Sequence, residues 1–252
     1  MTKLLFDTTD VANAAQAGWT KFRLYDRYFY NADRSRGVKE LVQKLALSHT
    51  VGPMIWNIEI WSLPQHEKQL IEIIDWAREV RPDIRQGFYA LIPKTNFWGP
   101  VQHKLGLVPN SYDSWLQVNA RLARGRGDDG RFVSRGLVDA VDFVCPSIYT
   151  FYNATDGGAY NLEELWHEFA RITIEQARKY QKQVYPFLWP HLHPSSHPDM
   201  PAMSEAAFRL QLETTLKNAD GVCVWDDGSL KPKFDCIPLM QEFATRNSAG
   251  EF

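Results

Sequence analysis

Hydrophobic and polar residues follow two alternating patterns along this chain of 252 residues. Short runs rich in apolar, β-branched and aromatic residues predict strands, and apolar residues spaced three and four apart predict helices. The predicted strands are 3–7, 21–29, 52–61, 84–92, 141–151, 183–189 and 221–227. The predicted helices are 37–47, 67–80, 114–124, 161–180 and 204–218, the last with an N-cap-like serine at its start.

The predicted strands are apolar nearly throughout, which is typical of parallel strands that helices cover on both faces. Seven such strands in a chain of this length fit a single (β/α) barrel of the TIM type. An open doubly wound sheet is the rival fold, but no glycine-rich phosphate turn follows the first strand. We therefore expect an α/β fold, with one seven-stranded barrel domain over residues 1–252. Segment 125–136, rich in glycine and charge, is expected to be a solvated loop.

Composition narrows the classes of partner. The formal net charge is −2 and there is no long run of lysine or arginine, so neither nucleic acid nor an anionic membrane surface is expected as a partner. No apolar run approaches the length of a membrane span, and the N-terminus has no apolar signal-peptide core. We expect a soluble protein whose compartment is open, secretion after removal of a leader included. The oligomeric state is not predicted.

Polar and aromatic side chains gather at the C-terminal ends of the predicted strands, where barrel enzymes hold their active sites. The candidates are Asp26, Asn57, Glu59, Tyr89, Tyr149, Tyr152, Trp189, Trp225, Asp226 and Asp227, with Trp56 and Trp61 as further groove-wall candidates. A carboxylic acid can protonate a leaving oxygen, and aromatic faces pack against sugar rings. The inventory therefore indicates hydrolysis of a glycoside.

The segment MIWNIEIW sets Asn57 and Glu59 two positions apart, which on a strand places both side chains on one buried face. Most glycosidases need two carboxylates, and no motif ties any of the three candidate aspartates to Glu59. In the substrate-assisted exception, a 2-acetamido group of the sugar attacks its own anomeric carbon. The protein then supplies one acid, here Glu59, and a neighbour that orients the acetamide, here Asn57.

Five short motifs occur in an order that resembles the hyaluronidase family of glycoside hydrolases, over about residues 50–236. WNIEIW resembles the family's D-x-E-x-W strand, and REVRP followed by QGFYALIP resembles its Arg-Pro turn and G-F-Y strand. CPSIY resembles its P-S-I-Y strand, and VYPFLW and ADGVCVWDDG resemble its last two strands. The resemblance implies that Glu59 is the acid, that Tyr89 contacts substrate, that Tyr149 helps to hold the acetamide-bearing sugar, and that Trp225 stacks on it.

The sequence departs from that family at Asn57, where the family has aspartate. An N-I-E strand with asparagine in this role resembles the endo-β-N-acetylglucosaminidases, which also use substrate assistance. The family's disulfides cannot be assigned among the three cysteines. We expect an endo-acting, retaining hydrolase of a polysaccharide with 2-acetamido sugars, similar to hyaluronan or chondroitin, that needs no cofactor or metal. Tyr89, Tyr152, Trp61, Trp189, Trp225, Asp26 and Asp226 are the expected substrate-binding residues.

Three alternatives stay open from the sequence. A glycosidase acting on a polymer without acetamido groups would pair Glu59 with one of the candidate aspartates. A barrel that binds a glycan without cleaving it is favoured by Asn57. His191, His193 and His197 fall within seven residues, a spacing that can bind zinc in a polysaccharide deacetylase, although prolines surround them.

Overall fold

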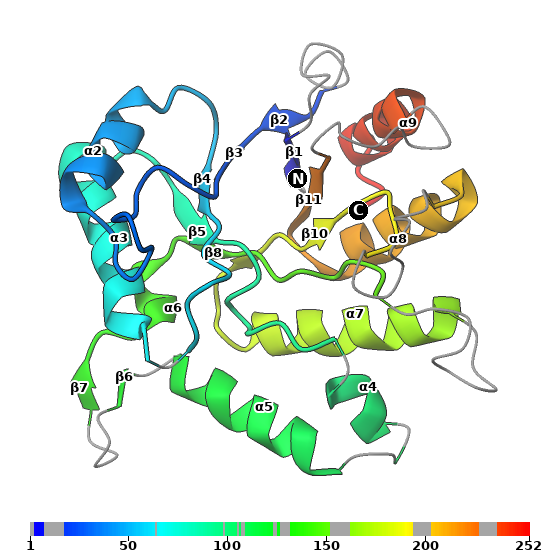
Figure 1. Cartoon of the computed structure of the whole chain (residues 1–252). Coiled ribbons are helices and arrows are strands. Elements are labelled where there is room, and N and C mark those ends of the chain that lie inside the picture. Colours follow the sequence, from blue (N-terminus) through cyan, green and yellow to red (C-terminus); the bar gives the residue numbers. More distant parts are fainter. Residues whose placement is uncertain are drawn as a thin grey trace.

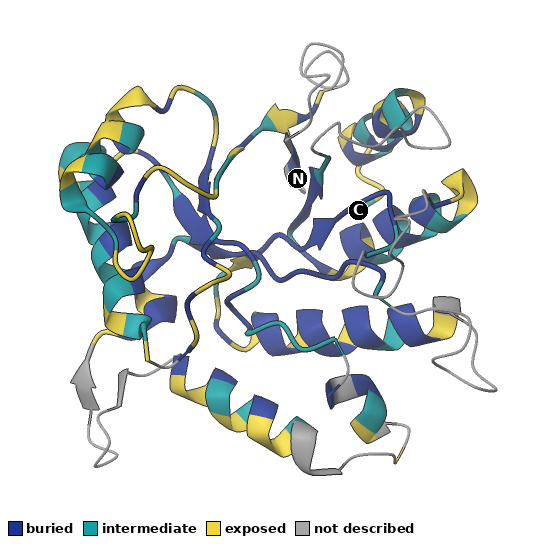
Figure 2. Ribbon diagram, in the orientation of Figure 1, coloured by how far each residue is buried: buried dark blue, intermediate teal, exposed yellow. Residues whose placement is uncertain are grey.

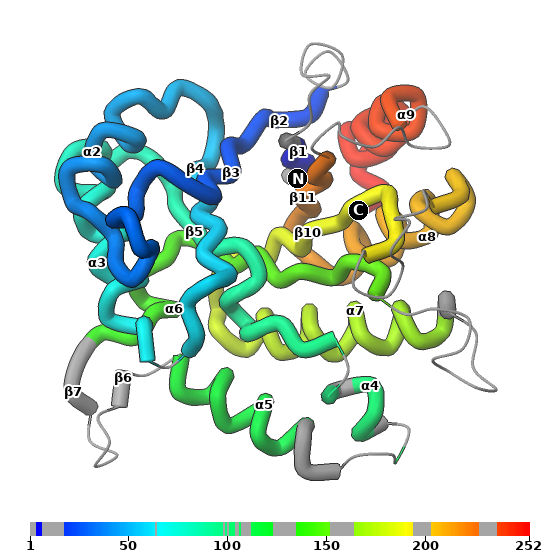
Figure 3. Tube along the Cα trace, in the orientation of Figure 1, coloured from blue at the N-terminus to red at the C-terminus, as the bar shows by residue number. Residues whose placement is uncertain are grey.

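The computed structural model describes residues 3–7, 18–63, 65–97, 99–104, 106, 109–122, 125–126, 132–151, 162–193, 203–226 and 236–252. Short parallel strands occupy the centre of the molecule, and helices surround them (Figure 1). The first strand lies beside the last one, although they come from opposite ends of the chain (Figure 3).

Seven strand positions, two of them divided into two pieces, make up the central sheet within the described residues. In chain order they are β1 (Lys3–Asp7), β2 (Thr20–Lys21) with β3 (Arg23–Tyr25), β4 (Met54–Trp56), β5 (Gln86–Phe88), β8 (Phe143–Val144), β9 (Gln183–Val184) with β10 (Phe187–Leu188), and β11 (Gly221–Trp225). Each position pairs in parallel with the next, the step from β5 to β8 being a bridge between Tyr89 and Cys145. Because β11 pairs with β1, the sheet closes on itself, and the predicted α/β barrel is confirmed.

Helices cover the outside of this sheet. The five predicted helices are α2 (Lys39–Ser48), α3 (Glu67–Val80), α5 (Pro109–Leu122), α7 (Leu162–Arg178) and α8 (Glu205–Asn218). The bounds of α3 match the prediction because its apolar stripe, which includes Leu70 and Ile74, is buried against the barrel. Ser204 caps α8, since its hydroxyl accepts a hydrogen bond from the backbone N–H of Ala207. No helix in the described ranges is long and apolar enough to cross a membrane.

Several elements differ from the prediction. The sequence did not predict the helices α4 (Gly99–Lys104), α6 (Leu137–Ala140) and α9 (Cys236–Ser248). Two of these are too short to show a helical period. The segment expected to be a solvated loop contains an antiparallel hairpin of β6 (Gly125–Arg126) and β7 (Phe132–Ser134). The barrel strands are also shorter than the apolar runs, because the chain leaves the sheet before each run ends, as it does at Trp56.

Two layers of buried side chains hold the barrel. Its interior is filled by residues such as Leu5, Phe22, Ile55 and Phe187, and a second layer packs between the strands and the helices. Figure 2 shows buried residues along the strands and on the helix faces turned toward them. Gly87 is required by close packing, since a Cβ atom there would lie 2.6 Å from the ring of Phe143.

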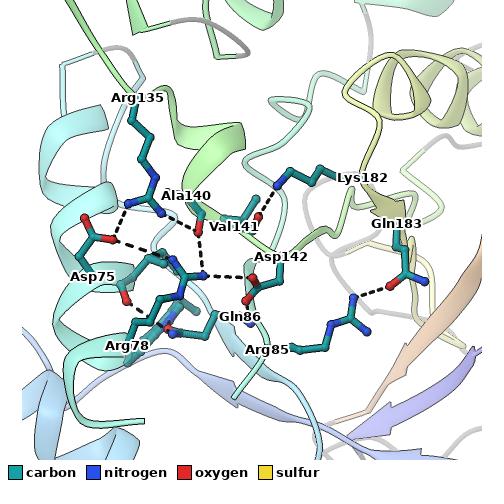
Figure 4. Close-up of polar contacts among 12 residues, drawn as sticks. Asp75, Arg78, Arg85, Gln86, Arg135, Ala140, Val141, Asp142, Lys182 and Gln183 are labelled. Atoms are coloured by element: carbon teal, nitrogen blue, oxygen red, sulfur yellow. Dashed lines mark hydrogen bonds and ion pairs between the residues drawn. The ribbon is translucent and has the colours of Figure 1, made fainter. Parts of the chain in front are cut away.

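Charged residues at the N-terminal end of the barrel form a paired network (Figure 4). Asp142 accepts hydrogen bonds from Nη2 of Arg78 at 3.1 Å and from the backbone N–H of Gln86 at 2.7 Å. Arg135 in turn bonds Asp75 at 2.7 Å. Each of these charged side chains has a partner, so the network stabilises the fold at this end of the barrel.

Candidate active site

A pocket of about 390 Å³ opens at the other end, beyond the C-terminal ends of β4, β5, β8 and β10. Its lining includes Glu59, Tyr89, Lys94, Phe97, Ser147 and His193. Parallel barrels hold their active sites at this end, because loops from several strands converge there. The pocket is therefore the candidate active site.

Glu59 lines this pocket and Asn57 contacts it from behind the lining, but the two do not lie on one strand. β4 ends at Trp56, and Glu59 lies exposed in the turn that follows, so the expectation that it lies on a buried strand face is wrong. The two side chains are nevertheless joined, since Nδ2 of Asn57 donates a hydrogen bond to Oε1 of Glu59 at 2.9 Å. The backbone of Asn57 is fixed by the carbonyl of Tyr25 at 2.8 Å and by the hydroxyl of Tyr30 at 3.4 Å.

The second polar atom of the Asn57 amide is not satisfied by the protein. Its Oδ1 is buried and has no hydrogen-bond partner within the described residues. A buried acceptor without a donor costs about 1–3 kcal/mol, so such atoms are informative where they occur beside a pocket. Turning the amide over would set its oxygen against the carboxylate of Glu59. The arrangement leaves Oδ1 of Asn57 as a buried acceptor next to the side chain of Glu59.

Two tyrosines lie beside Glu59. The hydroxyl of Tyr89 donates a hydrogen bond to Oγ of Ser147 at 3.3 Å, and its ring lies 5.8 Å from that of Tyr149. Burial raises the pKa of both tyrosines, and the negative charge of Glu59 raises each pKa further. The carboxylate is therefore within electrostatic range of both hydroxyls, which stay protonated and can act as donors.

Tyr149 also belongs to an aromatic cluster at the ends of β8, β10 and β11. Its ring lies 5.7 Å from Trp189 and 6.5 Å from Trp225, and the two tryptophans lie 5.4 Å apart. Trp225 is half-buried, whereas Trp189 is only 6% exposed and lies deeper in the cluster. The structure thus brings together three of the aromatic residues that the sequence suggested.

The other two tryptophan candidates are held by internal hydrogen bonds. Trp56 is fully buried, and its Nε1 donates to Oε1 of Gln86 at 3.1 Å, so the expectation that it forms a groove wall is wrong. Trp61 contributes to the pocket lining but is mostly buried, and its Nε1 donates to the carbonyl of Arg34 at 2.9 Å.

Neither Asp26 nor Asp226 is among the described residues that line the pocket. Asp26 is exposed, and both its oxygens accept hydrogen bonds from Arg27, at 3.0 and 3.2 Å. Asp226 is half-buried directly after β11. Asp227 and Tyr152 lie outside the described residues, as does His197 of the suggested zinc site. Within the residues that are described, no group of three His, Cys, Asp or Glu side chains could hold a metal ion.

Sequence reasoning missed an aromatic wall formed by Phe97, Phe151 and His193. The ring of Phe151 lies 4.2 Å from Phe97 and 4.5 Å from His193, and both pairs are stacked. Burial lowers the pKa of His193, while the charge of Glu59 raises it, so this wall also lies near the acid. Phe97 is in a loop that no periodic pattern marks, and His193 was considered only as a possible metal ligand.

Backbone strain is concentrated at the same end of the barrel. Of the four non-glycine residues with positive φ in the described part of the chain, three follow β3 or β5: Tyr28 at 70°, Arg34 at 57° and Ala90 at 60°. The fourth, Gln181 at 57°, precedes β9. Ala90 lines the pocket. Such conformations cost about 1–3 kcal/mol each and collect at functional sites. This supports the assignment of the pocket.

Comparison with solved structures agrees with this architecture. Bee venom hyaluronidase in complex with a hyaluronic acid tetramer matches with a TM-score of 0.60 and 14% identity, over 98% of this chain and 96% of that chain. A monoclinic crystal form of bee venom hyaluronidase matches with a TM-score of 0.56 and 12% identity, over 99% and 98%. The chain shares its fold with bee venom hyaluronidase.

Other comparisons add little to this likeness. An endoglucanase, Cel5A of Pseudomonas stutzeri, matches with a TM-score of only 0.48 and 16% identity, over 90% of this chain and 70% of that chain. No family profile matches the sequence, and no curated protein matches it significantly. At these identities the hyaluronidase likeness establishes the barrel fold alone, and the activity has to be argued from the site.

Proposed function

We propose that the protein is an endo-acting glycoside hydrolase that cleaves a polysaccharide containing 2-acetamido sugars, similar to hyaluronan or chondroitin. The observation that carries the proposal is the Asn57–Glu59 pair, with one amide atom bonded to the acid and the other buried and unsatisfied by the described protein groups. An acetamide N–H is a donor that would satisfy this second atom. The hyaluronic acid tetramer bound to a protein of the same fold supports the substrate class.

The proposed reaction proceeds in two steps with retention at the anomeric carbon. Glu59, protonated, gives its proton to the leaving glycosidic oxygen while the acetamide oxygen attacks the anomeric carbon. The bond to the leaving sugar breaks, and a cyclic oxazolinium intermediate forms. Glu59, now a carboxylate, takes a proton from the water that reopens the ring, which regenerates both the acid and the acetamide.

The neighbouring side chains orient the sugar in this scheme. Oδ1 of Asn57 accepts the acetamide N–H, which aligns the carbonyl and increases the electron density on its oxygen. The hydroxyl of Tyr149, supported by Tyr89, holds the acetamide-bearing sugar, and Trp225 provides a stacking surface. The position of Asp26, paired with Arg27 outside the pocket lining, argues against Asp26 as a second catalytic carboxylate.

Release of reducing ends from four oligosaccharides tests the proposal: hyaluronan, chondroitin, chitin and a neutral glucan. Cleavage of acetamido polymers only, lost in Glu59→Gln but kept in Asp26→Asn, is the expected result. Cleavage of the glucan would require a second carboxylate and would contradict substrate assistance. Saturable binding without any cleavage by the unaltered protein would favour a non-catalytic glycan-binding barrel.

A further inference from the structure

The pocket contains a cationic side chain that the proposed reaction does not use. Lys94 is half-buried and lines the same pocket as Glu59 and His193. Among the residues that the structure describes, its ammonium group forms no ion pair. Burial lowers the pKa of His193, which favours the neutral form of its ring. Lys94 is thus the fixed positive charge of the pocket lining.

The backbone of Lys94 is clamped from outside the barrel. Its N–H donates to Oδ1 of Asn119 at 2.7 Å, and its carbonyl accepts a hydrogen bond from Nε1 of Trp115 at 2.6 Å. Both partners are buried residues of α5, and Nδ2 of Asn119 bonds the carbonyl of Trp115 at 2.9 Å. A further hydrogen bond, from the hydroxyl of Tyr180 to the carbonyl of Asn119 at 3.1 Å, fixes the clamp to the end of α7.

The rest of the loop is closed locally. The backbone N–H and the hydroxyl of Thr95 both donate to the carbonyl of Ala90, at 3.0 and 2.8 Å. Ala90 itself has the strained positive φ noted above. The loop therefore presents Lys94 to the pocket from a fixed backbone, at a conformational cost that a solvated surface lysine would not need.

We propose that Lys94 is a specificity-determining residue that binds an anionic substituent, a carboxylate or a sulfate ester, on a sugar of the bound chain. That the ligand is a glycan rests on the proposed function. A positive charge on the wall of a pocket forms a charge-assisted hydrogen bond with an anionic ligand. When the ligand is neutral, the charge is desolvated on binding and gains no ion pair in exchange. The pocket then selects acetamido polymers that carry acidic sugars and disfavours neutral ones such as chitin. Since the chain as a whole carries a charge of −2, this selection is local to the pocket.

A matched pair of ligands isolates the charge: a hyaluronan hexasaccharide, and the same hexasaccharide with its carboxylates reduced to primary alcohols. Binding is measured by tryptophan fluorescence in the Glu59→Gln background, where the ligand is not cleaved. Lys94→Met, which keeps the length of the side chain, should weaken binding of the anionic form by roughly tenfold to a hundredfold. It should leave binding of the reduced form within about twofold, and Lys94→Arg should restore most of the loss.

Trp115→Phe removes the indole donor and keeps the ring, so it tests the clamp without removing the charge. It should lower the preference for the anionic ligand less than Lys94→Met does. A chondroitin hexasaccharide with and without sulfate then shows which anion is preferred. If Lys94→Met weakened binding of both hexasaccharides equally, the inference would be overturned, since Lys94 would then only maintain the shape of the pocket. Because these are binding measurements, they decide the role of Lys94 even if the unaltered protein cleaves neither ligand. A lack of cleavage would contradict the proposed function but not the role of Lys94.

Discussion

The polar groups described at the two ends of the barrel differ in whether other protein groups pair with them. At the N-terminal end, Asp142 bonds both Arg78 and a backbone N–H, so its charge is compensated (Figure 4). At the C-terminal end, Glu59 is exposed, Oδ1 of Asn57 has no partner in the described protein, and the charge of Lys94 is unpaired there. Groups that are satisfied within the protein stabilise the fold, and groups left unsatisfied around a pocket are available to a ligand. The contrast separates the polar residues assigned to stability from those assigned to ligand binding.

Glu59→Gln should give the largest effect at the pocket end. The amide cannot deliver a proton, so we expect kcat to fall by roughly 10²–10⁴-fold. The free energy of unfolding should change by less than about 0.5 kcal/mol, because the side chain is exposed. Reducing-end release and urea denaturation measure the two quantities. A variant that cleaves normally would remove Glu59 from the mechanism.

Asn57→Ala comes next in expected size. It removes the acceptor proposed for the acetamide, and kcat should fall by roughly tenfold to a hundredfold. Asn57→Asp is the matched control, since a carboxylate oxygen can still accept the N–H, and it should retain more activity than the alanine variant. Equal activity of Asn57→Ala and the unaltered protein, measured by reducing-end release, would mean that the buried Oδ1 serves no ligand.

Asp142→Ala tests the opposite end. It breaks the ion pair with Arg78 and leaves the backbone N–H of Gln86 without its acceptor. Because the pair is about one third exposed, we expect a moderate loss of about 1–2 kcal/mol in the free energy of unfolding. Under conditions where the variant is folded, kcat should not change. A loss of kcat with an unchanged free energy of unfolding would contradict the assignment of Asp142 to stability rather than to activity.

The pH dependence of stability gives the smallest effect. Burial lowers the pKa of His49, whose Nδ1 lies 3.1 Å from the hydroxyl of Tyr25 and whose Nε2 lies 3.0 Å from the carbonyl of Gly52. A lowered folded-state pKa means that the unfolded chain binds the proton more readily. Stability should therefore fall as the pH drops below about 6.5, the ordinary histidine value, and level off below the folded-state pKa.

Urea midpoints between pH 7.5 and pH 5 measure this slope. His49→Gln should make it shallower, and what is left includes the contribution of His193, whose pKa is also lowered by burial. An unchanged slope in the variant would show that His49 does not account for the dependence.

The sequence predicted the barrel well and its pocket less completely. All seven strand positions and five of the helices follow from apolar runs and helical stripes, because the core imposes these periods directly, whereas α9, with 13 residues, was missed despite its length. The adjacency of Asn57 and Glu59 was also predictable, although the strand ends before them. Lys94, Phe97 and the clamp from α5 were not predictable, since they depend on contacts between loops and helices far apart in the chain.

The role of the acetamide group is the central claim, and one matched comparison tests it most directly. A hyaluronan or chitin oligosaccharide is offered to the protein with its acetamido groups intact and with those groups removed to free amines. Cleavage of the acetylated oligosaccharide alone, with retention at the anomeric carbon by NMR, is the predicted result. Comparable cleavage of the deacetylated oligosaccharide would show that the protein supplies its own nucleophile or base, and would contradict the account.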